Sequence, residues 1–420
     1  MTRLYKILSN FFFLPILFYF VLRFFRSKET SQSIKEKFCY KKILRPRGKL
    51  IWVNAVSIGE TLSALSILKK IKKEYPKHII LLTTSTLSSA EIIKQRFSDN
   101  VIHQFAPIDV DFLIKKFIQK WSPDLVIFLE SEIWPNVLNS LNEKKIKIIL
   151  LNARMSETSF KIWSKFPKIS QSVFQNFDRC FAQDIKTSVR LKKLGVKNVK
   201  KITNLKFATE KLPVDNKELN FLNKFFVQKK IILLASSHKG EEELLIKIFK
   251  KLKEKYFNLL LIIAPRHITR RKEIIKILQR EKIEYALKST KKEISSNSEC
   301  FIADTFGEMG ILYKLSDIVI IGGSFINRGG QNPIEASDFK CSVIIGPHYD
   351  NFYEIVEILK REDAIIQVKN KKELMSELKS IISDNKKLLF SQNKLNETVK
   401  KQKKSTLKIW QDIKFLIEQI

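Results

Sequence analysis

Short apolar runs alternate with longer amphipathic segments along most of this chain, and this pattern predicts β-strands separated by helices. The runs with the length and composition of buried strands are 50–55, 79–83, 125–129, 146–152, 179–182, 231–235, 259–264, 300–303, 318–321 and 342–345. Helical periodicity lies between them, as in 61–73 and 241–255. Such alternation favours parallel sheets with helices on both faces, so we expect an α/β fold with doubly wound sheets.

A polar, non-periodic stretch at 209–219, which contains Pro213, separates the runs into two groups. A chain of 420 residues is also too long for a single core. We therefore predict two Rossmann-like domains, over 27–208 and 220–392, joined by a linker and followed by a long helix over 393–420. If the domains face each other across a crevice, a ligand should lie there, at the carboxyl ends of the strands.

The N-terminal segment differs from the rest of the chain because it is almost wholly apolar. Residues 11–22 read FFFLPILFYFVL and have basic residues on both sides. The run is shorter than the ~20 residues of a spanning helix, contains Pro15, and has no small-residue cleavage site after it. We predict an uncleaved membrane anchor over 1–26 that lies in or barely spans an anionic bilayer. The alternative is a buried amphipathic helix.

Composition adds a strong positive charge. The chain has 77 basic and 43 acidic residues, a net charge of +34, and 44% hydrophobic residues. Such a charge suits nucleic acid, an anionic membrane or a phosphorylated substrate, although abundant Lys, Ile and Asn also fit compositional drift on solvated faces. A nucleic-acid binder needs aromatic side chains on an exposed basic face, whereas the aromatics here crowd the N-terminal segment and the apolar runs. We therefore expect no nucleic-acid partner.

Glycine is concentrated in one stretch. Six of the eleven glycines lie in 304–336, around the apolar run 318–321. The run leads through Arg328-Gly329-Gly330-Gln331-Asn332 into Pro333-Ile334-Glu335-Ala336, where Asn and Pro suit the start of a helix. A strand, a glycine-rich loop and a helix N-terminus together predict a cradle for an anion or a nucleotide.

Polar residues that could carry chemistry follow several of the first-half strands. Glu60 follows the first strand and can act as a general base, or it can simply stabilise the first turn of a helix. Glu130 and Glu132 follow a buried run and cannot both be buried without partners. Arg154 can hold a phosphate or form an ion pair with a neighbouring Glu. Lys206 precedes the linker, where one lysine among many is usually solvated.

Second-half strands end in similar polar loops. Ser236, Ser237 and His238 follow one strand, and Pro265-Arg266-His267 follow the next. Arginine binds phosphate through two parallel hydrogen bonds, although ordinary loop chemistry explains these residues equally well. The chain contains neither a P-loop nor a dinucleotide-binding G-x-G-x-x-G after its first strand. Neither a D-x-D motif nor a His/Cys cluster suggests a metal site, so we expect no metal and no other cofactor.

In chain order, these motifs resemble those of the 3-deoxy-D-manno-octulosonic acid (Kdo) transferase family. The motifs that carry the resemblance are SIGE at 57–60, ESEIWPN at 130–136, NARMSE at 152–157, NLKF at 204–207, SHKGEE at 237–242, PRH at 265–267, GEM at 307–309 and RGGQNPIE at 328–335. The match runs from the N-terminal segment to IGPHYDNF at 345–352. It implies a GT-B glycosyltransferase that transfers Kdo from CMP-Kdo to a lipid A precursor, lipid IVA, with inversion, on the cytoplasmic face of the inner membrane.

The same resemblance assigns roles to residues. It implies that Glu60 is the proton acceptor and that Glu130 and Lys206 stabilise the transition state. The residues it implies for CMP binding are Pro265, Arg266, Gly307, Glu308, Met309, Asn332, Pro333, Ile334 and Glu335. Departures from the family pattern are mild: Asn54 and Gln331 stand where His is usual, Lys239 replaces an acidic residue, and Thr203 and Ala208 replace Gly and Asp. Another GT-B transferase with a different nucleotide-sugar donor is the alternative.

Overall fold

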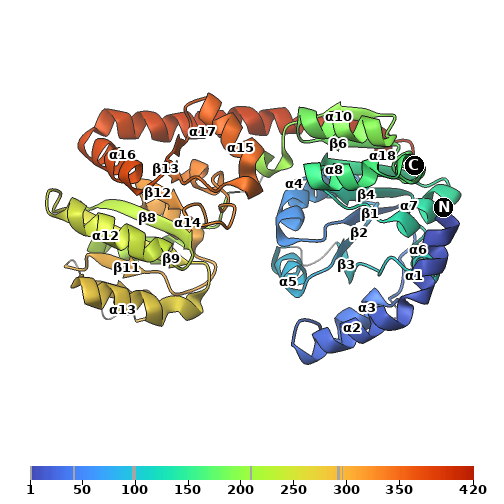
Figure 1. Cartoon of the computed structure of the whole chain (residues 1–420), viewed down its shortest axis with the longest axis horizontal. Helices are drawn as coiled ribbons and strands as arrows, with labels where there is room; N and C mark the ends of the chain where they lie inside the picture. The colour runs from blue at the N-terminus through green and yellow to red at the C-terminus, as the bar shows by residue number, and fades with distance from the viewer. Residues whose placement is uncertain (1, 41–42, 97–100, 209–210, 291–293, 296) are drawn as a thin grey trace. The chain divides into compact units, whose positions relative to one another are not determined.

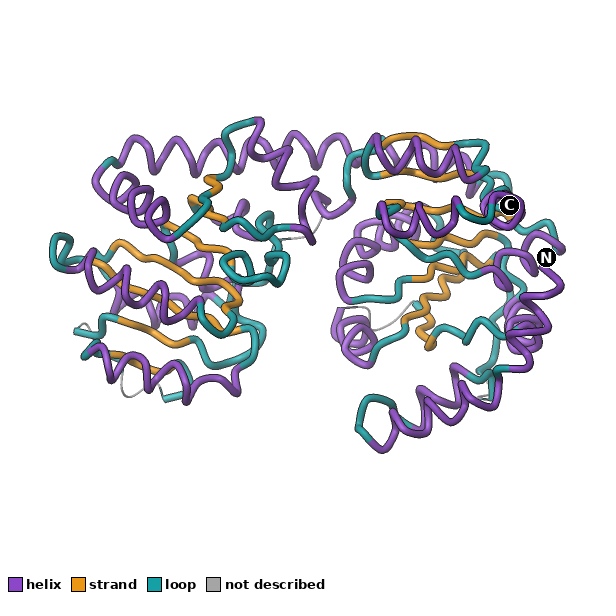
Figure 2. Tube along the Cα trace, viewed as in Figure 1, coloured by secondary structure: helices purple, strands orange, loops and turns teal. Residues whose placement is uncertain are grey.

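The computed structural model describes residues 2–40, 43–96, 101–208, 211–290, 294–295 and 297–420. It divides the chain into two compact units, of which unit 1 comprises residues 1–209 and 403–420 and unit 2 comprises residues 210–402. Each unit is a parallel sheet between layers of helices (Figures 1 and 2). The predicted linker begins at this division, and its first two residues, 209 and 210, lie outside the described residues.

Unit 1 contains a seven-stranded parallel sheet in the order β3-β2-β1-β4-β5-β6-β7. Its strands are β1 (Leu50–Asn54), β2 (Ile79–Thr84), β3 (Ile102–Phe105), β4 (Leu125–Leu129), β5 (Lys147–Ala153), β6 (Arg179–Ala182) and β7 (Val199–Lys201). Its helices are α1 (Thr2–Phe11), α2 (Phe13–Phe25), α3 (Ser31–Lys37), α4 (Ile58–Glu74), α5 (Leu87–Arg96), α6 (Asp111–Trp121), α7 (Pro135–Glu143), α8 (Glu157–Ser164), α9 (Pro167–Phe174), α10 (Ile185–Leu194), the 3₁₀ helix η1 (Leu205–Ala208) and the C-terminal α18 (Ile409–Ile417).

Alternating side chains of β1 show how this sheet is covered. Trp52 packs in one apolar cluster with α6, α7 and α9, whereas Ile51 and Val53 pack in another with α4, α5 and α18. Every residue of β1 is buried, as expected for a central strand of a parallel sheet. The registers Ile51↔Ile80 and Ile51↔Leu125 align β1 with β2 and β4, so the three strands end at one edge of the sheet.

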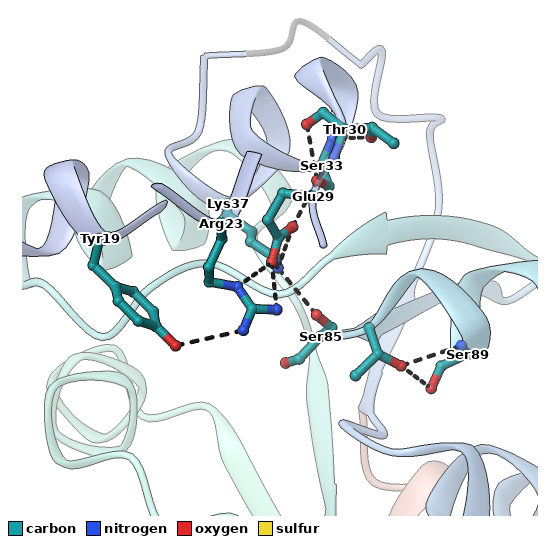
Figure 3. A network of polar contacts seen from close by, with 9 residues as sticks. Tyr19, Arg23, Glu29, Thr30, Ser33, Lys37, Ser85 and Ser89 are labelled. Atoms are coloured by element: carbon teal, nitrogen blue, oxygen red, sulfur yellow. Dashed lines mark hydrogen bonds and ion pairs between the residues drawn. The ribbon is translucent and has the colours of Figure 1, made fainter. Parts of the chain in front are cut away.

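The N-terminal helices pack on unit 1 through one face only. Phe13 and Phe20 of α2 contact a small cluster around Phe38, while Arg23 donates from Nε to Glu29 at 3.1 Å. Glu29 and Lys37 form a buried ion pair, and Lys37 Nζ also donates to the Ser85 carbonyl at 3.0 Å (Figure 3). Buried charges persist where they are paired and hydrogen-bonded, so this network holds the end of α2 against the body of unit 1.

Unit 2 contains a second seven-stranded parallel sheet in the order β10-β11-β9-β8-β12-β13-β14. Its strands are β8 (Lys230–Ser237), β9 (Leu259–Pro265), β10 (Tyr285–Leu287), β11 (Cys300–Ile302), β12 (Ile318–Ile321), β13 (Ser342–Ile345) and β14 (Ile366–Gln367). Its helices are α11 (Asn216–Phe226), α12 (Glu241–Lys253), η2 (Ile268–Arg270), α13 (Arg271–Glu281), α14 (Met309–Leu315), η4 (Glu335–Phe339), η5 (Asp350–Phe352), α15 (Tyr353–Arg361), α16 (Lys371–Ser383) and α17 (Asn385–Leu407), which continues into unit 1.

The predicted fold class is confirmed, and the ten strands expected from apolar runs are present with small shifts at their ends. Four further strands, β3, β7, β10 and β14, are short and lie at or next to sheet edges. Half-exposed edge strands need no continuous apolar run, so the sequence pattern does not mark them.

The single helix expected over 393–420 is instead α17 followed by α18. The Lys408 N–H bonds the Ser405 carbonyl, three residues back, and this tighter turn ends α17.

The glycine-rich stretch differs from its prediction. No α-helix starts at Pro333; the segment forms the five-residue 3₁₀ helix η4, which ends at Lys340 in a left-handed conformation with φ of 57°. The helix predicted to start here is therefore a short 3₁₀ helix that begins at Glu335, and the anion cradle stays a prediction. Gly322 is required by packing, because a Cβ there would lie 2.3 Å from the Ser236 carbonyl oxygen at the end of β8.

Candidate active site

Three of the residues singled out by sequence lie at the carboxyl edge of the unit 1 sheet. Glu130 follows β4 directly, Glu60 lies in the first turn of α4 after β1, and Lys206 lies in η1 after β7. Glu130 has a left-handed backbone, with φ of 55°. Non-glycine residues in this conformation are strained and concentrate at functional sites, where the surrounding structure imposes them.

Glu60 is buried and closes the start of its own helix. Its carboxylate accepts the Val56 N–H at 2.8 Å and the Ser57 hydroxyl at 3.0 Å, while Ser57 Oγ accepts the Glu60 N–H. Only 8% of the residue is exposed. Burial, together with the negative charges of Glu132 and Glu130, raises the pKa of Glu60 to about 7. Glu60 therefore stabilises the first turn of α4, as one of the two sequence interpretations expected. This role is compatible with a second role as a general base, because the pKa of a general base should lie near neutrality.

Glu130 forms an ion pair with Lys206. Lys206 Nζ lies 3.2 Å from Glu130 Oε1, and the two side chains are 17% and 12% exposed. The backbone of Glu130 is held on both sides by β5, because its N–H bonds the Leu151 carbonyl and its carbonyl accepts the Arg154 N–H, each at 3.0 Å. Lys206 is thus not the solvated lysine that statistics would suggest. The pair sets a cation next to a carboxylate at the sheet edge.

Glu132 belongs to the same group, although the sequence alone gave it no role. The Trp134 indole N–H donates to its carboxylate. Burial raises the pKa of Glu132, and Glu130 adds to the rise. The requirement that both acids have partners is met by Lys206 for Glu130 and by Trp134 for Glu132. The sequence feature that could have indicated this partner is Trp134, which lies two residues after Glu132.

In unit 2 the residues expected to bind CMP lie at the end of β9 and after β11 and β12, at one edge of that sheet. Arg266 and Gly307 are exposed, whereas Pro265, Pro333 and Ile334 are buried. Asn332 Nδ2 donates to Glu335 Oε1 at 3.3 Å, and Asn332 Oδ1 accepts the Ile334 N–H. Buried Pro333 and Ile334 can therefore offer a ligand only their backbone, while Asn332 and Glu335 can offer side chains.

Glu308 and Met309 lie where the β11 loop enters α14. Glu308 accepts the Thr305 hydroxyl and lies 3.6 Å from Lys288 Nζ. Met309 is the first residue of α14 and is half-buried. These contacts hold the Glu308 side chain in place. Within the described residues, no hydrogen bond or ion pair connects Glu308 with Arg266, the charged residue expected to bind CMP after β9.

A group of cations surrounds His238 after β8. Burial lowers the pKa of His238, and the charges of Arg328, His267 and Arg266 lower it further. Glu241 holds this region together by accepting the N–H groups of Gly323 and Phe325 at 2.8 and 3.0 Å. A cationic loop edge of this kind favours an anionic ligand such as a phosphate. Across the described ranges, His, Cys, Asp and Glu nowhere form a group of three that could hold a metal ion.

Two parallel doubly wound units place the chain in the GT-B fold class, a fold that solved structures of a glycosyltransferase and an epimerase share. Similar solved structures include a glycosyltransferase from Rickettsia africae, with a TM-score of 0.59 and 14% identity over 88% of this chain and 99% of that one. Another is UDP-GlcNAc 2-epimerase from Neisseria meningitidis, with a TM-score of 0.58 and 14% identity over 86% of this chain and all of the other.

Proteins of similar sequence identify the family within this fold class. The family described as 3-Deoxy-D-manno-octulosonic-acid transferase (kdotransferase) matches residues 32–209. The 3-deoxy-D-manno-octulosonic acid transferase of Rickettsia bellii is 36% identical, over 92% of each chain. That of Haemophilus influenzae is 33% identical, over 77% of this chain and 76% of the other. The chain belongs to the Kdo transferase family and is a glycosyltransferase.

Proposed function

We propose that the protein transfers Kdo from CMP-Kdo to a lipid A precursor, lipid IVA, with inversion at the sugar carbon. The observation that carries the proposal is the buried carboxyl group of Glu60, with a pKa of about 7, beside the acidic pair Glu130 and Glu132. Glu60 takes the proton from a hydroxyl group of the lipid acceptor, and the oxygen of that hydroxyl group attacks the sugar. The bond from the sugar to the CMP phosphate breaks, and CMP leaves with the electron pair.

Glu130 and Lys206 stabilise this transition state. The Lys206 ammonium can balance the donor carboxylate or the charge that develops on the departing phosphate, and Glu130 holds it in place at 3.2 Å. Unit 2 takes the CMP part of the donor, through Arg266, Asn332, Glu335 and the loop of residues 307–309. The cations around His238 supply the positive charge that a metal would otherwise provide, so the reaction needs no metal.

The proposal is tested by incubating the purified protein with CMP-Kdo and tetra-acylated lipid A precursor and weighing the lipid product by mass spectrometry. We expect addition of Kdo, undiminished by EDTA, and inhibition by CMP but not by UDP. Loss of activity in EDTA would contradict the metal-free mechanism. Inhibition by UDP rather than CMP, with no Kdo transfer, would favour another nucleotide-sugar transferase acting on a membrane lipid.

We infer that the N-terminal helices anchor the protein to the cytoplasmic face of the inner membrane. Within the described residues, no single helix has the length and hydropathy of a membrane span, although Tyr5–Phe11 and Phe13–Phe25 together do, with a 50° bend between them. Phe11, Leu14 and Phe25 are 76, 70 and 78% exposed. A large exposed apolar surface of this kind, flanked by basic residues, suits an anionic lipid interface.

Changing Phe11, Leu14 and Phe25 together to serine is expected to lower affinity for vesicles of phosphatidylglycerol and phosphatidylethanolamine by at least about 1,000-fold, because each apolar side chain contributes about 1.5–3 kcal/mol when buried. Sedimentation with the vesicles measures the effect. The matched control is Phe257→Ser, since Phe257 is 77% exposed but lies in unit 2. Equal loss in the control, or unchanged binding of the triple variant, would contradict the anchor.

A further inference from the structure

Three buried amide side chains lie next to the segments that carry the ion pair of Glu130 and Lys206. Asn152, Gln183 and Asn204 are 0, 7 and 3% exposed, and we call them the amide cluster. Asn204 Nδ2 donates to Gln183 Oε1 at 3.0 Å, and Asn152 Nδ2 donates to Asn204 Oδ1 at 3.4 Å. Buried amides that hydrogen-bond one another fix the geometry of their neighbours, because a displacement breaks these bonds and leaves a buried polar group without a partner.

The amide cluster holds the start of η1, which carries Lys206. The Leu205 N–H donates to Asn152 Oδ1 and the Lys206 N–H donates to Asn204 Oδ1, both at 3.0 Å. The first N–H groups of any helix have no partner within it and must find one elsewhere. Here both partners are side chains of the amide cluster, so the position of the Lys206 backbone depends on Asn152 and Asn204.

The other member of the ion pair is attached to the same place. The Glu130 backbone bonds the backbone of Leu151, just before Asn152, and of Arg154, two residues after it at the end of β5. Asn152 itself has φ of 54°, a left-handed conformation that asparagine tolerates better than most residues. One strand end therefore holds Glu130 through its backbone and Lys206 through a side chain.

We propose that Asn152 is a positioning residue that, with Asn204 and Gln183, sets the place of Lys206 against Glu130 for catalysis. This inference rests on the proposed function of that pair. Asn152 touches neither substrate in this assignment and acts only through η1. Its removal should lower the rate of the chemical step and leave substrate binding unchanged.

The test is kinetic and uses Asn152→Gly, because glycine accepts the left-handed backbone and removes only the amide. We expect kcat for Kdo transfer to fall about 100-fold, as for a catalytic group displaced by about 1 Å, with KM for both substrates within about two-fold. The double variant Asn152→Gly/Lys206→Met should be no slower than Lys206→Met alone. Asn204→Ala, which frees the Lys206 N–H from another side, should behave like Asn152→Gly.

The matched control is Asn176→Ala. Asn176 is a buried amide of unit 1 that donates to Asn139 Oδ1 and the Ser172 carbonyl, away from the ion pair. It should lose thermal stability and keep its kcat. Losses that multiply in the double variant, or a wild-type kcat in Asn152→Gly, would overturn the inference.

Failure of the proposed function gives a different result, because the wild type would then form no product. The positioning inference would in that case be decided by amide hydrogen exchange at Leu205 and Lys206. We expect faster exchange at these two groups in Asn152→Gly than in the wild type. Unchanged exchange would overturn it.

Discussion

Glu60→Gln is expected to lower kcat for Kdo transfer by about 10²- to 10⁴-fold, the range found when a general base is removed. Glutamine keeps the size of the side chain and an oxygen that can accept the Val56 N–H, so the start of α4 should remain intact. It cannot take a proton from the acceptor hydroxyl. The measurement is product formation at saturating CMP-Kdo and lipid acceptor, together with CMP affinity by calorimetry, which should not change.

The chain offers a matched control for this change. Glu373 lies in the first turn of α16 in unit 2, and its Oε2 accepts the Lys369 N–H at 2.8 Å, much as Glu60 accepts that of Val56. Glu373→Gln should keep the wild-type rate. Wild-type turnover by Glu60→Gln would refute the assignment of Glu60 as the base and leave it only its role in the helix cap.

The pH dependence of the wild type follows from the same group. Because the pKa of Glu60 is raised to about 7, the carboxylate that accepts the proton becomes abundant only as pH rises through that value. We therefore expect kcat to rise with pH around 7 and to lose this limb in Glu60→Gln. The effect on folding has the opposite sign: the raised pKa stabilises the fold below about pH 4.5, and that stabilisation is lost as pH rises through about 7.

Lys206→Met is expected to lower kcat by about 10²- to 10³-fold, the effect of removing one group that stabilises charge in a transition state. Methionine keeps most of the apolar stem and removes the ammonium. The change also leaves the Glu130 carboxylate without its cation, which should lower the free energy of unfolding by up to about 3 kcal/mol. Steady-state kinetics and thermal unfolding measure the two effects separately.

Adding Glu130→Gln to this variant separates catalysis from stability. The double variant removes the unpaired charge, so its unfolding temperature should recover while its kcat stays low. Lys161→Met is the control, because the Lys161–Glu157 pair lies one helical turn apart on the exposed face of α8 and contributes little. Recovery of kcat in the double variant would show that Lys206 serves only to neutralise Glu130.

Several features of the fold could be predicted because they depend on local pattern. A run such as Leu50–Asn54, buried at every position, has a composition that only a central strand of a sheet covered on both faces would need. The edge strand β7 could not be found this way, since it is two-thirds lysine and partly solvated. The helix expected at Pro333 begins at Glu335 and is a 3₁₀ helix, a type that the sequence could not specify because Asn and Pro suit a 3₁₀ helix as well as an α-helix.

In the candidate site, too, some features follow from local sequence and others depend on tertiary contacts. Local order along the chain was enough to place Glu60 at a helix start, since its contacts with Ser57 lie within one turn. The raised pKa of Glu60 was beyond reach from sequence, because it depends on burial and on two carboxylates that reach it from another strand.

The sequence by itself therefore determined the α/β class, the buried strands and the family, because apolar periodicity and short motifs are properties of neighbouring residues. Only the tertiary structure decided that Lys206 pairs with Glu130 and that Asn152 and Asn204 hold η1 in place. These contacts join segments far apart in the chain. They exist because parallel strands bring their carboxyl ends to one edge of the sheet, where burial makes each polar group depend on a specific partner.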